Sequence, residues 1–126
     1  MQRHCVILAS VRSTDVARAY ADALDRSDDE AAADLMTEDV ELVFAHGSIR
    51  GRAAWLEMRA QRTPPEHLEE NVEDAEYVET SEGTEMRARL VQRWIESGEV
   101  ASEQPLRVGF VIVDGLISSI EFAPGV

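Results

Sequence analysis

The sequence has a single cysteine, Cys5, among its 126 residues. One thiol cannot form an intrachain disulfide, and it cannot build a cysteine-based zinc site within one chain. Long apolar runs are scarce too, since the run Cys5–Ala9 is shorter than a signal-peptide core and far shorter than a membrane span. We therefore expect a cytoplasmic protein with a leader arm at residues 1–12 and a single domain at residues 13–126.

Basic side chains are in short supply. Lys and Arg number 12 against 25 Asp and Glu, which gives a formal net charge of −13. A chain with this charge repels nucleic-acid backbones and anionic bilayers. We expect neither nucleic acid nor a membrane as a partner. The 44% hydrophobic content is that of an ordinary globular domain.

Helical periodicity dominates the first half of the chain. A helix is predicted from Ser13 or Thr14 to about Arg26, with Tyr20 on its apolar face, and a short second helix from Ser27 to about Met36. Residues 40–46 alternate as a strand. Residues 53–61 form a third helix, which a pair of prolines ends.

The second half predicts four antiparallel strands joined by turns at residues 81–83, 96–99 and 114–115. In the strand before residue 95, one face carries Met86, Ala88, Leu90 and Trp94. The other carries Glu85, Arg87, Arg89 and Arg93. Helices followed by a strand meander indicate an α+β domain, in which three N-terminal helices pack on a curved, mainly antiparallel sheet.

This element order resembles the cone-shaped NTF2-like superfamily, which includes ketosteroid isomerases, SnoaL-like polyketide cyclases and scytalone dehydratases. The resemblance covers residues 14–122. Its most specific parts are residues 19–28, similar to the first-helix signature of these families, and His67 with Asn71 after a proline-containing turn.

The resemblance implies a catalytic set. Tyr20 matches the oxyanion-hole tyrosine of ketosteroid isomerase, but the two aspartates of that enzyme fall on Phe44 and within residues 108–110. Without those carboxylates the steroid isomerase mechanism is not supported. The scytalone dehydratase pattern instead implies that His67 is acid and base and that Asp25 orients it. A second histidine of that family falls on Gln92.

Each of these residues also has a structural interpretation. Tyr20 could be a core tyrosine, and Asp25 could be solvated. His67 could be a surface histidine in an acidic patch, because alternation from Leu68 and Val72 turns it outward. The expected wall of a substrate pocket consists of Phe44, Trp55, Met58, Gln92, Trp94, Phe110 and Phe122.

The function these residues predict is cofactor-independent proton transfer, as dehydration, isomerisation or cyclisation, on a polyketide-like or related carbonyl compound. The alternative is a non-catalytic binding or assembly module. We expect a small apolar organic ligand, no cofactor and no metal. We also expect a homodimer through the outer sheet face, where Val91 and Ile95 lie among the arginines.

Overall fold

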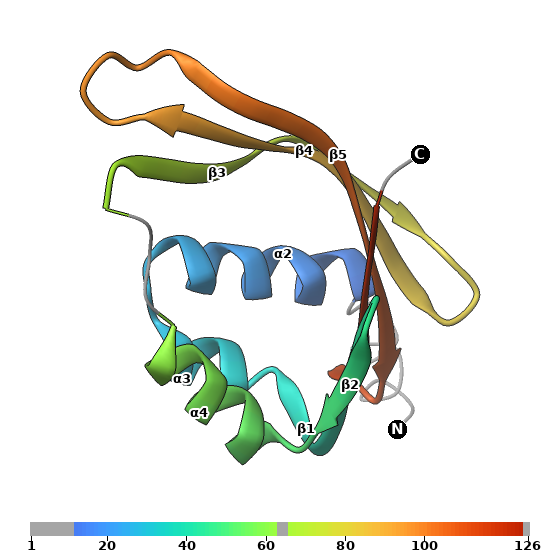
Figure 1. Ribbon diagram of the computed structural model, residues 1–126. Coiled ribbons are helices and arrows are strands. Elements are labelled where there is room, and N and C mark those ends of the chain that lie inside the picture. Colours follow the sequence, from blue (N-terminus) through green and yellow to red (C-terminus); the bar gives the residue numbers. More distant parts are fainter. Residues whose placement is uncertain (1–11, 63–65, 125–126) are drawn as a thin grey trace.

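The computed structural model describes residues 12–62 and 66–124, and it confirms an α+β architecture. Within these two ranges, three helices pack on one side of a six-stranded sheet: α2 (Ser13–Asp25), α3 (Asp29–Ala33) and α4 (Arg52–Gln61) (Figure 1). The predicted leader arm lies outside the described residues except for Arg12, which directly precedes α2. The second helix is shorter than predicted. Asp28 rather than Ser27 caps it by accepting the Ala31 N–H at 3.1 Å, and the helix ends at Ala33, because the chain enters β1 at Met36.

The sheet has the strand order β2-β1-β6-β5-β4-β3. Its strands are β1 (Met36–Phe44), β2 (Gly47–Arg50), β3 (Leu68–Glu79), β4 (Gly83–Trp94), β5 (Val100–Val113) and β6 (Leu116–Pro124). All pairs are antiparallel except β1 with β6. Strand β2 was not predicted, because its four residues show no alternation and become a strand only by pairing with β1.

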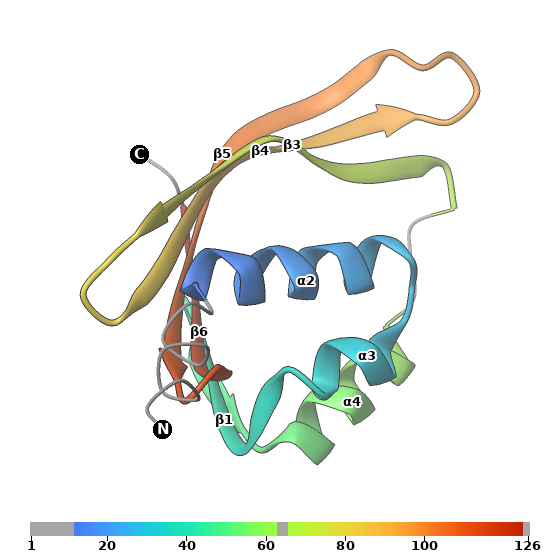
Figure 2. The same cartoon turned by 180° about the vertical axis from the view of Figure 1, so that it is seen from behind.

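The sheet bends around α2. Figures 1 and 2 show β3, β4 and β5 along one side of this helix, α3 and α4 along the other, and β1 and β6 near its N-terminal end. That end is fixed by hydroxyl groups: Thr84 Oγ1 donates to Ser13 Oγ at 2.7 Å, and Ser13 Oγ donates to the Gly83 carbonyl at 2.8 Å. The helix is therefore anchored to the start of β4.

The outer face of the sheet differs from the expected dimer surface. Val91 is only 1% exposed, so it is not available to a second copy. The neighbouring arginines pair within the chain: Arg93 with Glu73, Arg89 with Glu103 and Asp74, and Arg87 with Glu85. The hydrogen bond from Arg93 lowers the pKa of Glu73.

The homodimer stays a prediction. Sedimentation velocity at micromolar concentration tests it, and a monomer would contradict it.

A close approach of two strands makes Gly83 sensitive to substitution. A Cβ atom there would lie 2.9 Å from the Ile112 nitrogen and closer still to the Phe110 carbonyl oxygen. Since these are backbone atoms, relief requires the strands to separate. We expect Gly83→Ala to lower the free energy of unfolding by about 2 kcal/mol or more, measured by urea denaturation.

The matched control is Gly109→Ala, in the strand beside β4, where an added Cβ would meet nothing within 4 Å. This variant should stay within about 0.5 kcal/mol of the unsubstituted chain. Equal stability of the two variants would contradict the close approach at Gly83.

Candidate functional site

A cavity of about 330 Å³ lies between α2 and the concave face of the sheet. Apolar side chains form most of its wall, together with two phenols and two carboxylates. The lining residues are Tyr20, Ala21, Asp22, Leu24, Asp25, Val72, Ala75, Tyr77, Met86, Leu106, Val108, Phe110 and Phe122. This volume lies at the lower end of the range for small-molecule sites.

The helical wall follows from the spacing of α2. Tyr20 and Leu24 are four residues apart and share the face that packs toward the sheet. Asp22 and Asp25 lie at the border of that face, where the side chains are solvent-exposed but still line the cavity. The carboxylates therefore stand at the mouth, and the apolar side chains form the interior.

The strand wall depends on a bulge in β3. The pairing shifts between Glu73 and Glu76, and Asp74 adopts a positive φ of 56°. The extra residue changes which side chains face inward, so that Ala75 and Tyr77 reach the cavity. Sequence reasoning missed Tyr77, because nothing in the residue pattern marks the position of this bulge.

Tyr20 is the most buried polar side chain of the cavity, at 5% exposure. Burial raises the pKa of its phenol to about 12. The positive charge of Arg59 and the Trp55 side chain, which donates toward the phenol oxygen, make this rise smaller. The negative charge of Asp29 makes it larger. An indole N–H can only donate, so the Tyr20 proton stays available for an acceptor on a ligand. At neutral pH this residue is a hydrogen-bond donor.

Tyr77 lies opposite the acidic edge of α2. Burial raises the pKa of its phenol, the charge of Arg18 lowers it, and the carboxylates of Asp22 and Asp25 raise it. The Arg18 guanidinium carbon sits 4.8 Å from the centre of the Tyr77 ring, which is a cation–π contact across the mouth.

Only some of the predicted pocket residues line this cavity. Phe110 and Phe122 do so. Phe44 stacks on Phe122 with ring centroids 5.1 Å apart, and Trp55 is buried beside Tyr20 with centroids 6.3 Å apart. Both therefore support the wall from outside it.

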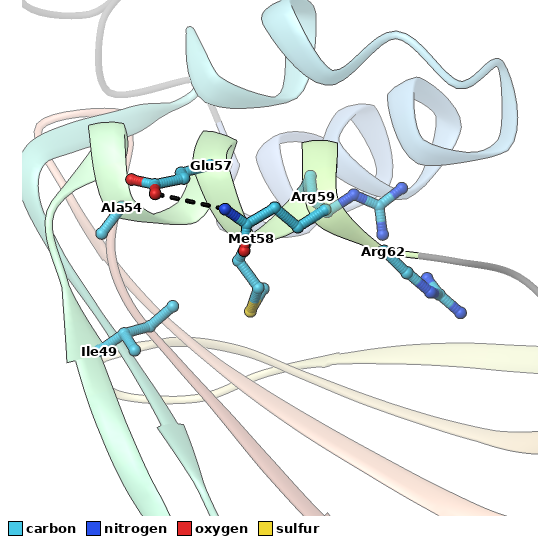
Figure 3. Close-up of a pocket in the computed structure, with 7 residues that line it drawn as sticks. Ile49, Ala54, Glu57, Met58, Arg59 and Arg62 are labelled. Atoms are coloured by element: carbon cyan, nitrogen blue, oxygen red, sulfur yellow. Dashed lines mark hydrogen bonds between the residues drawn. The ribbon is translucent and has the colours of Figure 1, made fainter.

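The other three predicted wall residues lie elsewhere. Gln92 donates to Glu70 and accepts from Ser102, and Trp94 is 46% exposed near the end of β4. Met58 lines a separate hollow of about 650 Å³ beside α4. Figure 3 shows Met58 and Ile49 extending toward this hollow, while Arg59 and Arg62 extend along the end of the helix.

His67 does not reach the cavity. Its side chain is 74% exposed and lies 3.9 Å from Glu66, just before β3 begins. No hydrogen bond or ion pair joins it to Asp25 within residues 12–62 and 66–124. The structure thus brings Tyr20 and Asp25 to one cavity and leaves His67 outside it, with its ring exposed to solvent just before β3.

Within the described ranges, no group of three or more His, Cys, Asp or Glu side chains is placed to hold a metal ion. No helix of the described part of the chain is long and apolar enough to cross a membrane.

Comparison with known families identifies the class. The model of the SnoaL-like domain family matches residues 12–117, so the chain belongs to the SnoaL-like domain family. The resemblance drawn from the sequence is thereby confirmed at the level of the family and of the NTF2-like fold. No curated protein matches the chain.

Several solved structures share the fold. A candidate polyketide cyclase from Xanthomonas campestris pv. campestris has a TM-score of 0.72 at 22% identity, over 88% of each chain. Another from Silicibacter sp. reaches 0.73 at 17% identity, over 90% of this chain and 89% of that one. An NTF2-like protein of unknown function from Burkholderia pseudomallei reaches 0.71 at 14% identity, over 90% of both chains.

The raised pKa of Tyr20 predicts a loss of stability at alkaline pH. Between pH 10 and about 12 the phenol ionises in the unfolded chain but stays protonated in the folded one. Its contribution is therefore complete below pH 10 and declines as the pH rises toward 12. We expect this decline to reach about 2–3 kcal/mol, measured by urea unfolding across that range.

Tyr20→Phe should remove most of this alkaline decline, whereas Tyr77→Phe should retain most of it. An identical decline in the unsubstituted chain and in Tyr20→Phe would show that Tyr20 is not the group responsible.

Proposed function

We propose that this SnoaL-like domain binds a small, flat, largely apolar carbonyl compound of polyketide-like type in the α2–sheet cavity and catalyses cofactor-independent proton transfer on it. The observation that carries the proposal is the composition of the cavity. One buried phenol donor lies among apolar walls, and carboxylates stand at the mouth. The candidate polyketide cyclases of similar fold support the substrate class.

Proton transfer beside a carbonyl needs a base and a group that stabilises charge on the carbonyl oxygen. Asp25 is proposed as the base, since its carboxylate lines the cavity mouth. Its oxygen takes the proton from the carbon next to the carbonyl, and the bonding pair leaves negative charge on the carbonyl oxygen. The Tyr20 hydroxyl donates to that oxygen. Return of the proton to another carbon completes an isomerisation.

His67 has no part in this version of the mechanism. Its exposed ring cannot reach a ligand enclosed between α2 and the sheet. The same exposure favours the second candidate function, a non-catalytic binding module, because it places the residue implied as acid and base outside the cavity.

The two functions are separated by hydrogen–deuterium exchange at the α-carbon of 1-tetralone, followed by proton NMR in D2O. The enzyme proposal predicts exchange above the buffer rate. Asp25→Asn should reduce the protein-catalysed exchange by about 10²-fold or more. Tyr20→Phe should reduce it by a similar factor, since it removes the donor to the developing oxyanion.

Two substitutions serve as controls. Asp34→Asn, on an exposed aspartate outside the cavity lining, and His67→Ala should both leave the exchange rate unchanged. Binding of 1-tetralone without any catalysed exchange would establish the binding module instead. Loss of exchange in His67→Ala or Asp22→Asn, with full activity in Asp25→Asn, would overturn the assignment of Asp25.

A further inference from the structure

A row of side chains connects the surface between α3 and α4 with the phenol of the cavity. The Arg59 Nε atom lies 3.3 Å from Oδ1 of Asp29, and the Arg59 guanidinium carbon lies 5.8 Å from the centre of the Trp55 ring. The Trp55 ring lies 6.3 Å from the Tyr20 ring at an angle of 50°. Neither Arg59 nor Asp29 lines the cavity.

We propose that Arg59 is a positioning residue for Tyr20: held by Asp29 and packed on Trp55, it fixes the Tyr20 hydroxyl for donation to the oxygen of the ligand. The inference rests on the proposed function, in which Tyr20 binds the carbonyl oxygen. It adds a residue outside the cavity to the set that determines which ligands bind.

Arg59 acts on Tyr20 through the packing of Trp55, whose ring lies near both residues. Trp55 is 1% exposed, so its indole cannot reorient without disturbing the core around it. A guanidinium within about 6 Å of the ring centre is attracted to the indole face. The Arg59 side chain is only 20% exposed, so solvent screens this attraction less than it would screen a surface pair.

The positive charge of Arg59 also favours donation by the Tyr20 hydroxyl. Arg59 is the charge that most lowers the pKa of Tyr20, and Asp29 opposes it more weakly. A positive charge that favours negative charge at the phenol oxygen also strengthens the O–H as a donor to an enolate-like oxygen. Loss of Arg59 should therefore weaken binding of a carbonyl ligand more than binding of its hydrocarbon analogue.

Arg62 provides a matched control at the same end of α4. It makes an ion pair of similar length, 3.0 Å to Glu70, and lines no part of the cavity. The charges that shift the pKa of Tyr20 are those of Arg59 and Asp29, and Arg62 is not among them. Replacing either arginine with Met removes one charge and one ion pair, but only Arg59→Met acts on the row that ends at Tyr20.

The experiment uses the full chain with 3-fluorotyrosine in a Tyr77→Phe background. Since the sequence has two tyrosines, a single ¹⁹F signal then reports on Tyr20. Fluorination lowers the intrinsic pKa of a phenol, which makes the titration easier to follow while the protein is folded. The affinities of 1-tetralone and of tetralin, which lacks the oxygen, are measured from the ligands' own proton NMR signals, so that Tyr20→Phe can be measured in the same way.

We expect Arg59→Met to raise the pKa of Tyr20 and to reduce the preference for 1-tetralone over tetralin by about two- to tenfold, with tetralin affinity unchanged. Arg59→Lys keeps the charge, so the Tyr20 pKa and the preference for 1-tetralone should lie between those of the parent protein and of Arg59→Met. Arg62→Met should change neither. A purely structural role of Arg59 would lower both affinities equally and leave the titration unchanged.

The outcomes separate this inference from the proposed function. If neither compound binds the parent protein, the proposed function fails. If 1-tetralone is preferred and Tyr20→Phe abolishes that preference while Arg59→Met does not, Tyr20 keeps its role and the positioning by Arg59 is overturned. Equal effects of Arg59→Met and Arg62→Met would overturn it as well.

Discussion

The packing of the Tyr20 ring against Trp55 on α4 and Phe110 on β5 is the contact on which the arrangement of helices and sheet depends. The Tyr20 and Phe110 centroids lie 5.7 Å apart at 70°, and Trp55 contacts Tyr20 from the helical side. Edge-to-face pairs of this kind stabilise beyond the area they bury. One side chain thus holds α2 between the helical layer and the sheet, and the same side chain lines the cavity.

This dual role limits the chemistry that the site can perform. A phenol buried to this extent stays protonated far above neutral pH, so Tyr20 can donate a hydrogen bond but cannot serve as a base. Proton acceptance falls to the carboxylates at the mouth. In the proposed mechanism the buried end of the cavity binds the oxygen and the mouth exchanges the proton, which agrees with the gradient from apolar interior to charged rim.

Acidic residues are balanced differently on the two faces of the sheet. On the outer face, arginines of β4 pair with Glu73 and Glu103 across the strands, so the charge there is neutralised within the chain. On the concave side, Asp22 and Asp25 make no ion pair within the described residues. What sets Asp22 and Asp25 apart from other acidic residues outside ion pairs, such as the control residue Asp34, is that they line the cavity.

The sequence by itself determined the fold class and the face on which Tyr20 lies, because helical and strand periodicities are local properties of the chain. It also predicted Phe110 and Phe122 as inward residues from simple alternation. Tertiary structure alone decided three matters. The bulge at Asp74 turned Tyr77 inward, Val91 on the outer face became buried, and Trp94 on the predicted inner face stayed 46% exposed. Each depends on contacts between distant segments, which periodicity does not encode.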